Sequence, residues 1–245
     1  MRVYIVGGWV RDTLLGLKPK DADFVVVGCS PQEMLDKGFK EVGKDFSVFL
    51  HPVTGDEYAL ARVERKVSQG YKGFDCTWEG VTLEDDLARR DLTINAMAME
   101  VVVDDKGSFQ VVGDVIDLFG GVGDLKKKYL RHTTDAFKQD PVRVLRIARF
   151  LARYGDDWKV TPSTIKLIKE IESSGELESL VPERVWLETE KALKEKYPQK
   201  YFEFLVGYDF PFMKHFRDMV ATIENNPFHQ ERNVFIHNDG AETRC

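Results

Sequence analysis

Short apolar runs alternate with polar helical patterns through the first half of the chain. Residues 2–6 form a continuous apolar run of strand length, and two glycines separate it from a helix predicted to end at Gly16. Residues 21–28, DADFVVVG, are rich in β-branched side chains and predict a second strand. The segment SPQEMLDKG then predicts a helix, with a Ser cap, a Pro at the first helical position and an end at Gly38.

The next elements continue this mixture of strands and helices. SVFLHP and DEYALARVE predict a hairpin that turns at Thr54-Gly55, whereas residues 66–80, rich in Gly and Ser, predict a mobile loop. LEDDLARRD predicts a polar helix, INAMAMEVVV a strand, and residues 114–128 a further helix. Together these elements predict a mixed α/β domain.

From about residue 133 only helical patterns remain. Four segments start at a proline and carry apolar residues at helical spacing, namely PVRVLRIARFLARYG, PSTIKLIKEIESSG, PERVWLETEKALKEK and PQKYFEFLVG. The last stretch is polar and weakly periodic, which predicts a loose tail. We therefore expect an α+β protein with a mixed domain over residues 1–132, a helical domain over 133–223 and a weakly ordered tail over 224–245.

Composition narrows the class of protein. The 245 residues are 43% hydrophobic and 31% charged, which is typical of a soluble globular protein. No run approaches the roughly 18 apolar residues that span a bilayer, and the N-terminus does not resemble a secretory signal. Three widely spaced cysteines predict neither a disulfide framework nor a CxxC metal site, so we expect a reducing, cytoplasmic location.

The overall charge does not indicate a nucleic-acid binder, because the net charge is −6. Any RNA contact must use local basic patches. Candidates are the lysines of 126–128, the arginines of 143–153 and the lysines of 191–200. Each patch can also be a solvated helix face.

Two carboxylates open the second predicted strand. Residues i and i+2 of a strand project from one face, so Asp21 and Asp23 would repel each other unless a cation lies between them. Mg²⁺ suits such a pair, because it prefers oxygen ligands and fills its other positions with water and substrate phosphates. It could then polarise a phosphoryl oxygen and activate an attacking hydroxyl. The alternative is a solvated strand edge with two exposed acids.

The glycine turn before this strand suits a phosphate. Gly7 and Gly8 have no Cβ, so a phosphate can approach the free N–H groups at the start of the helix. Arg11, one turn further, can add a bidentate contact. A Gly-Gly turn is also a common structural device, but the order of glycine turn, arginine helix and paired aspartates favours phosphate binding.

Arginines recur at every third position in QDPVRVLRIAR. Arg143, Arg146 and Arg149 would form a broad stripe on the predicted helix, beside an apolar side. Three neighbouring arginines need anions, which phosphates or an Asp partner would supply. The alternative is an amphipathic helix with a solvated arginine face.

Several motifs in register carry a family resemblance. GGWVRDTLLG followed by KDADFVVVG resembles the signature of the DNA polymerase β-like nucleotidyltransferases and, more narrowly, the bacterial class II CCA-adding enzymes of the poly(A) polymerase family. Further segments follow in the family's order: PQEMLDKGFKEVGKDFSVFLHP, EYALARVERK, LEDDLARRDLTINAMA, IDLFGGVGDLKKKYLRH, QDPVRVLRIARF and LVPERVWLETEKAL. The similarity runs from residue 1 to about residue 210. It implies a polymerase β-like head with a mixed sheet, followed by an all-α neck.

The resemblance implies an activity and a metal. A CCA-adding enzyme adds CMP and AMP from CTP and ATP to the 3′ end of tRNA, without a nucleic-acid template, and releases diphosphate. Asp21 and Asp23 would be catalytic and would hold Mg²⁺, which activates the tRNA 3′-hydroxyl for in-line attack on the α-phosphorus. Either Glu57 or Glu64 could supply a third carboxylate.

Nucleotide contacts are implied in the head. Gly8 and Arg11 would hold the triphosphate. In RRDLTIN, Arg90 would contact the nucleotide, while Asp91 and Asn95 resemble the pair that senses the ribose 2′-hydroxyl. The alternative for Asp91 is that it caps a helix or pairs with Arg90.

Further contacts are implied in the neck. Asp140 and Arg143 would read the Watson–Crick edge of the incoming base, with Arg supplying donors and Asp supplying acceptors. Arg146 and Arg149 would lie nearer the phosphates.

Two departures from the family pattern matter. Gln139 stands where the family usually has Glu, which could alter the orientation of Arg143 and the switch from CTP to ATP. The chain also stops before the usual body and tail helices, so we expect a C-terminally truncated member in which a homodimer could supply the missing RNA surface. No HD dipeptide occurs, so no phosphohydrolase activity is expected.

The sequence supports three hypotheses for the function. The first is CCA addition. The second, within the same chemistry, is a poly(A) polymerase or an enzyme that adds only part of CCA. The third is a non-catalytic tRNA-binding remnant, against which the intact Gly8, Arg11, Asp21 and Asp23 argue.

Overall fold

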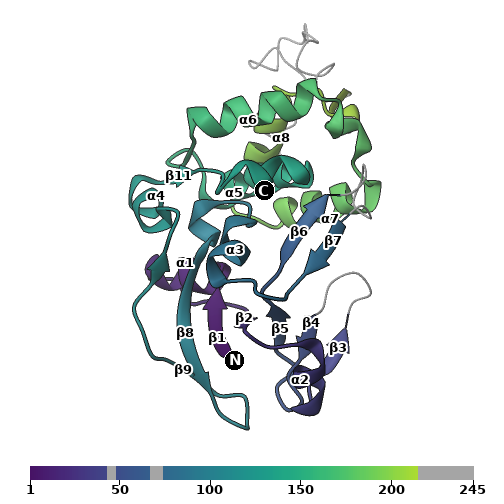
Figure 1. Cartoon of the computed structure of the whole chain (residues 1–245). Helices are drawn as coiled ribbons and strands as arrows, with labels where there is room; N and C mark the ends of the chain where they lie inside the picture. The colour runs from purple at the N-terminus through teal and green to yellow at the C-terminus, as the bar shows by residue number, and fades with distance from the viewer. Residues whose placement is uncertain (43–47, 67–73, 215–245) are drawn as a thin grey trace, which may run out of the picture. The chain divides into compact units, whose positions relative to one another are not determined.

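The structure is a computed structural model that describes residues 1–42, 48–66 and 74–214 (Figure 1). The chain divides into two compact units, Met1–Asp140 and Pro141–Cys245. The first unit extends past residue 132, where the sequence predicted the head to end. Phe137 is buried, and the hydroxyl of Thr134 donates to the carbonyl of Ala88 at 2.8 Å, which ties these residues to the head. The predicted tail over 224–245 lies outside the described residues.

A mixed sheet organises the first unit (Figure 1). Its strands follow the order β10 (Ile116–Asp117), β8 (Met97–Val103), β1 (Arg2–Val6), β2 (Asp23–Val27), β5 (Glu57–Leu60), β4 (Val48–Leu50) and β3 (Lys40–Val42), and β9 (Phe109–Val111) also pairs with β8. The antiparallel pair of β4 and β5 confirms the predicted hairpin around Thr54-Gly55.

The register of the sheet brings the end of β1 and the starts of β2, β5 and β8 to the same end of the sheet, here called the sheet edge. β1 runs antiparallel to both β2 and β8, so Val6 lies opposite Asp23 and Ala98. β5 runs parallel to β2, with Tyr58 beside Phe24. Because neighbouring strands lie about 5 Å apart, the turn after β1 and the starts of β2 and β5 meet at the same edge.

Apolar side chains cover both faces of the central strands. Tyr4, Val6 and Val25 pack with Leu87 and Ala98 in one cluster. On the other side, the ring of Phe24 stacks on Tyr58 at a centroid distance of 4.5 Å and meets the edge of Phe109 at 5.3 Å. Alternate side chains of β2 therefore point to opposite faces, as its period of two requires.

Short helices connect the strands of the first unit. These are α1 (Gly8–Leu14), α2 (Pro31–Asp36), α3 (Leu83–Ala88) and α4 (Gly121–Lys127), with 3-10 turns η1 (Thr93–Asn95) and η2 (Asp135–Gln139). The Ser cap predicted for α2 is present as a full capping box, in which Ser30 and Glu33 exchange hydrogen bonds. The helix predicted over 114–128 begins only at Gly121, because residues Ile116–Asp117 pair with β8 instead.

The loop predicted over residues 66–80 is wrong for Phe74–Thr77. These residues form strand β7, which pairs antiparallel with β6 (Val63–Lys66) in a separate two-stranded sheet. Gly and Ser residues near this segment concealed a strand that is defined by its pairing with β6. Residues 67–73 lie outside the described residues. Strands β3 and β9 were likewise not predicted.

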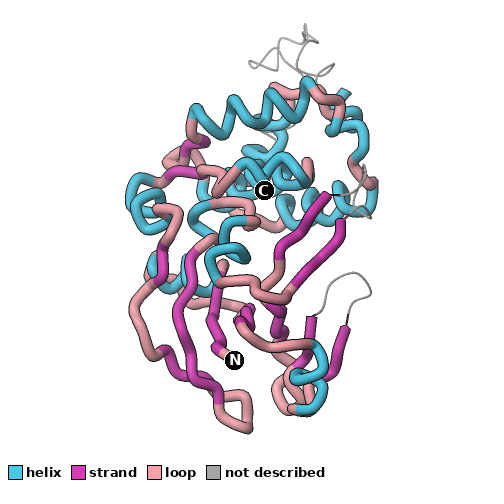
Figure 2. Tube along the Cα trace, viewed as in Figure 1, coloured by secondary structure: helices cyan, strands magenta, loops and turns pink. Residues whose placement is uncertain are grey.

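The second unit is helical among its described residues, apart from the two-residue strand β12 (Lys159–Val160). All four predicted helices are confirmed, as α5 (Val142–Tyr154), α6 (Pro162–Ser173), α7 (Pro182–Leu193) and α8 (Gln199–Leu205), with 3-10 turns η3 (Glu176–Ser179) and η4 (Pro211–Met213) (Figure 2). Helix α5 packs against α7 and α8. The two units together confirm the predicted α+β class.

In the part of the chain that the structure describes, no helix is both long enough and apolar enough to pass through a bilayer.

Candidate functional site

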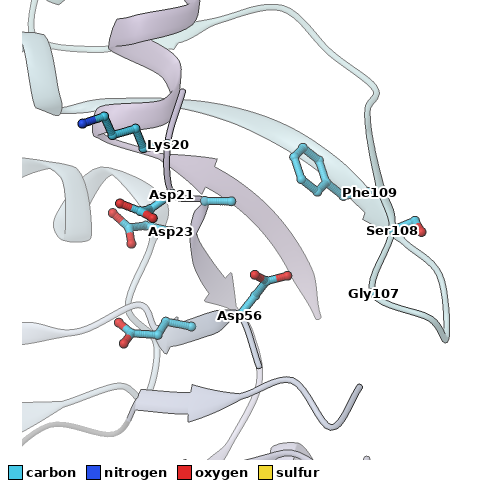
Figure 3. Close-up of a pocket in the computed structure, with 9 residues that line it drawn as sticks. Lys20, Asp21, Asp23, Asp56, Gly107, Ser108 and Phe109 are labelled. Atoms are coloured by element: carbon cyan, nitrogen blue, oxygen red, sulfur yellow. The ribbon is translucent and has the colours of Figure 1, made fainter. Parts of the chain in front are cut away.

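Asp21 and Asp23 line one open pocket of about 680 Å³ at the sheet edge (Figure 3). Asp23 is the first residue of β2, whereas Asp21 precedes the strand. The prediction that both residues lie within the strand is therefore wrong, because β2 pairs with β1 only from Asp23 onward. In Figure 3 the two carboxylates nevertheless point to the same side, so the juxtaposition that the sequence argument required is present.

A third carboxylate reaches this pocket. The pocket is lined by Lys20, Asp21, Ala22, Asp23, Asp56, Glu57, Gly107, Ser108 and Phe109. Of the two candidates from the sequence, Glu57 lines it because β5 starts beside β2 at this edge. The side chain of Glu64 lies outside the described part of the structure. Asp56, also in the lining, accepts the Thr54 hydroxyl at 2.7 Å and so belongs to the β4–β5 turn.

The donor set suits a hard cation that retains other ligands. Among the described residues, no three or more His, Cys, Asp or Glu side chains are arranged to hold a metal ion by themselves. Mg²⁺ does not need such a cage, since one or two carboxylates together with substrate phosphates and water complete its octahedron. Asp21 and Asp23 fit that requirement, and Glu57 adds negative charge to the same pocket.

The glycine turn after β1 depends on Gly7 more than on Gly8. Gly7 has a φ of 67°, a left-handed value that disfavours any side chain. A Cβ on Gly7 would also lie 3.2 Å from Nη1 of Arg90. Gly8 opens α1, and a Cβ there would meet Nη2 of Arg11 at an ordinary 3.6 Å. Both glycines were expected to form the turn, with Gly8 assigned to the triphosphate, and the structure shows that Gly7 is the position whose backbone requires glycine.

A buried hydrogen-bond chain links three of the predicted residues. Arg11, 5% exposed, donates through Nη1 to Oδ1 of Asn95 at 2.7 Å. Nδ2 of Asn95 donates to Oδ1 of Asp91 at 3.1 Å, and the same oxygen accepts the N–H of Leu92 at 2.8 Å. The structure thus brings Arg11, Asn95 and Asp91 together from segments far apart in the sequence.

Two buried aspartates hold the arginines of the site, and sequence reasoning missed both. Oδ1 of Asp12 accepts Nε of Arg11 at 2.8 Å. Oδ2 of Asp86 accepts Nη2 of Arg90 at 3.1 Å. The i,i+4 spacing of Asp86 and Arg90 on a predicted helix was the available signal. Nothing in the sequence alone showed that Asp86 would be fully buried.

In the second unit the arginine stripe has the predicted form. Arg143, Arg146 and Arg149 are half-buried on α5, and the positions between them are buried. Nε of Arg149 donates to Oε2 of the buried Glu188 on α7 at 2.7 Å, and Nη1 of Arg146 lies 3.9 Å from Oε1 of the same residue. Glu188 is therefore an acidic partner of Arg146 and Arg149, at a place where the sequence led us to expect an Asp or phosphates. The predicted phosphate contacts of Arg146 and Arg149 stay a prediction.

Asp140 ends the first unit, as the residue after η2, and Arg143 lies in the first turn of α5. Their joint reading of a base stays a prediction.

Comparisons with known proteins identify relatives of the whole described chain. A family model described as the poly A polymerase head domain matches residues 3–131. An apo form of a CCA-adding enzyme shares 34% sequence identity over 93% of this chain and 52% of that one, with a TM-score of 0.69. The Thermotoga maritima CCA-adding enzyme in complex with tRNA shares 33% identity over 92% of this chain and 50% of that one, with a TM-score of 0.64. A tRNA-processing enzyme with CTP shares 32% sequence identity over 93% of this chain and 57% of that one, with a TM-score of 0.64.

This chain therefore spans about half the length of the solved structures that it matches. The resemblance inferred from the sequence motifs, including the expected head fold, is confirmed.

Proposed function

Because this chain belongs to the family of the poly A polymerase head domain, we propose that it adds CMP and AMP from CTP and ATP to the 3′ end of tRNA, without a nucleic-acid template. The observation that carries the proposal is the pocket at the sheet edge, where Asp21 and Asp23 lie beside Glu57. The solved structures that this chain resembles include CCA-adding enzymes in complex with tRNA or with ATP and a tRNA-processing enzyme with CTP. The reaction is expected in the cytoplasm.

Mg²⁺ is the proposed metal, and Asp21 and Asp23 would hold it. When bound, it would supply Lewis-acid stabilisation of phosphoryl charge and lower the pKa of a coordinated hydroxyl. Glu57 is proposed as the third carboxylate of this pocket.

The remaining residues would bind and orient the nucleotide. Gly7 and Gly8 leave the turn after β1 open to a phosphate, and Arg90 lies against that turn. Since Asp91, Asn95 and Arg11 form one hydrogen-bonded chain, we propose that they act as a unit that places the ribose relative to the phosphates. Pre-formed contacts of this kind lower the entropic cost of bringing the α-phosphorus to the 3′-hydroxyl.

In the second unit, Arg143 is proposed to read the base together with Asp140. The helix that carries Arg143 is held by the bond between Arg149 and Glu188, which limits its rotation. Gln139 is neutral where the family usually carries Glu. We expect this difference to affect the choice between CTP and ATP more than the rate of transfer.

One assay separates the candidate activities. The full chain is incubated with tRNA lacking its 3′ CCA, with Mg²⁺ and with labelled CTP, ATP or both. Ordered addition of C, C and A supports the proposal. Open-ended A tails support a poly(A) polymerase, the activity after which the matching family is named. Addition of C or A alone indicates a partial CCA-adding enzyme, and tRNA binding without any extension contradicts transfer altogether.

Asp21→Ala tests the metal ligands in the same assay. We expect transfer to fall on the order of 1000-fold or more, because several kcal/mol of transition-state stabilisation would be lost. Binding of tRNA should persist. Asp36→Ala is the control, since Asp36 is exposed on α2 and its carboxylate accepts a hydrogen bond from Gln32 at 2.8 Å. Transfer by Asp21→Ala at the wild-type rate would refute the assignment.

A further inference from the structure

Asp86 is a fully buried carboxylate close to the glycine turn. It lies on α3 and is 0% exposed. Its Oδ1 accepts two hydrogen bonds from Arg89, from Nε at 3.0 Å and from Nη2 at 2.5 Å. Its Oδ2 accepts one from Nη2 of Arg90 at 3.1 Å. Each oxygen of the carboxylate therefore serves a different arginine.

The two arginines differ in where they lie. Arg89 is the residue at which α3 ends, and its pair with Asp86 spans one helical turn. Arg90 lies one residue beyond, and its Nη1 is 3.2 Å from the position that a Cβ on Gly7 would take. The bond to Asp86 thus fixes the guanidinium of Arg90 against the turn between β1 and α1.

Arg90 retains hydrogen-bonding capacity at this turn. Its Nε is buried and has no hydrogen-bond partner among the described residues. A buried donor without a partner is unfavourable, and a hydrogen bond to an acceptor oxygen of a ligand would relieve this cost. Phosphate oxygens match a guanidinium that is already oriented.

Asp86 keeps its charge in this position. Burial raises its pKa, but the positive charges of Arg89 and Arg90 and their hydrogen bonds outweigh burial, so its pKa lies below the ordinary range. The residue is therefore a fixed anion at neutral pH, and its removal would leave two neighbouring guanidinium groups without their shared partner.

We propose that Asp86 is a positioning residue, which holds the guanidinium of Arg90 against Gly7 so that Arg90 receives the phosphates of the incoming nucleoside triphosphate. The inference rests on the proposed function for the identity of the ligand. It assigns to Asp86 an effect on the phosphates, and none on the base or on tRNA.

Asp86→Asn tests the inference by equilibrium binding of CTP and of cytidine to the full chain with Mg²⁺. Asn keeps the shape but loses the charge and one acceptor oxygen. We expect the Kd for CTP to rise roughly 10-fold to 100-fold, as for the loss of one charge-assisted hydrogen bond. The Kd for cytidine should change less than about threefold, since cytidine carries no phosphate.

Asp85→Asn is the matched control, because Asp85 lies on the same helix and its carboxylate caps α3 through Thr82. It should lower the melting temperature without changing the preference for CTP over cytidine. A merely structural role for Asp86 predicts that both variants reduce the binding of CTP and cytidine in equal proportion, and that result would overturn the inference.

The pair Asp86 and Arg90 should behave as one unit. Arg90→Ala should weaken CTP binding, and Asp86→Asn in that background should add less than a twofold further loss. Fully additive effects would count against the inference. Should Asp86→Asn fail to fold, Asp86→Glu keeps the charge but displaces it by one methylene, and its Kd for CTP should still rise selectively. An unchanged Kd in Asp86→Glu would contradict the inference.

The experiments distinguish a failure of the proposed function, nucleotide transfer, from a failure of the positioning role of Asp86. A wild-type chain that binds CTP but extends no tRNA would remove the proposed function, while a selective loss in Asp86→Asn would still support the positioning role. If the wild-type chain extends tRNA but the Kd for CTP is unchanged in Asp86→Asn, the proposed function stands and the inference about Asp86 is wrong.

Discussion

At the scale of single residues, the arginines of the site donate hydrogen bonds to buried carboxylate and amide side chains. Arg11 is held by Asp12 and Asn95, and Arg90 is held by Asp86. Arginine suits these positions because it stays protonated and presents several donors in a fixed plane. The consequence is that the side chains proposed to meet the nucleotide are positioned before it arrives.

Gly7→Ala tests the role of the turn. Gly7 has a φ of 67° and a ψ of −122°, and Gly16 has a φ of 70°, so alanine at either position should lower stability through backbone strain, by about 1–3 kcal/mol. Only at Gly7 would the new Cβ press on Arg90, because nothing lies within 4 Å at Gly16. We therefore expect Gly7→Ala to raise the Kd for CTP, whereas Gly16→Ala leaves it unchanged.

Thermal melts and CTP titrations on both variants decide this point. A Kd for CTP that rises in Gly7→Ala alone, while both variants remain folded at the temperature of the titration, supports the contact between Gly7 and Arg90. Equal Kd values would show that the turn matters for folding alone.

At the scale of secondary-structure elements, strand pairing positions the residues of the head, whereas a side-chain hydrogen bond between helices positions those of the helical unit. In the head, the register of β1, β2 and β5 brings Gly7, Asp23 and Glu57 to one sheet edge. In the helical unit, one buried acid on α7 anchors the arginine stripe of α5. Glu188, 5% exposed, accepts Nε of Arg149 at 2.7 Å and lies within 3.8 Å of Nζ of Lys191.

Glu188→Gln should therefore weaken the packing of α5 on α7. The half-buried Arg149 would lose its charge-assisted bond to the buried Glu188, so we expect the free energy of unfolding to fall by about 1–3 kcal/mol. Glu190→Gln is the control on the same helix, because Glu190 forms an exposed pair with Lys194. Its free energy of unfolding should match the wild type within error.

Chemical denaturation of the two variants measures this difference. A Glu188→Gln variant as stable as Glu190→Gln would contradict this role of Glu188 and would indicate that Glu195, whose Oε1 lies 3.8 Å from Nη1 of Arg149, is a sufficient partner.

At the scale of the whole molecule, the proposed binding of tRNA has to be reconciled with a net charge of −6. The lysines at the end of α4 are exposed, as the predicted local patch requires. If they meet tRNA phosphates, each should contribute a counterion to the salt dependence of binding.

Lys126→Gln with Lys127→Gln should lower tRNA affinity and reduce the slope of log K against log salt by about 1.5–2. Lys166→Gln with Lys169→Gln changes the net charge equally at exposed positions of α6 outside the predicted patches. Titrations of both double variants between low and moderate salt distinguish a local patch from a general charge effect, which would give equal slopes.

Light scattering on the same samples tests the expected homodimer.

The sequence by itself determined the local elements and the family. The Ser cap of α2, the four Pro-initiated helices and the β1–turn–α1 segment depend on neighbours within a few residues, so their patterns are readable along the chain. The glycine turn followed by the paired aspartates carried the family resemblance.

Only the tertiary structure decided which distant groups meet. Arg11 bonds to Asn95, 84 positions later, and Arg149 to Glu188, 39 positions later. Glu57 joins the pocket because β5 pairs beside β2, and Asp86 lies buried because α3 packs on the sheet. Strands β3, β7 and β9 were missed for the same reason. A short strand is stabilised by its pairing partner, and that partner is set by the fold and not by its own residues.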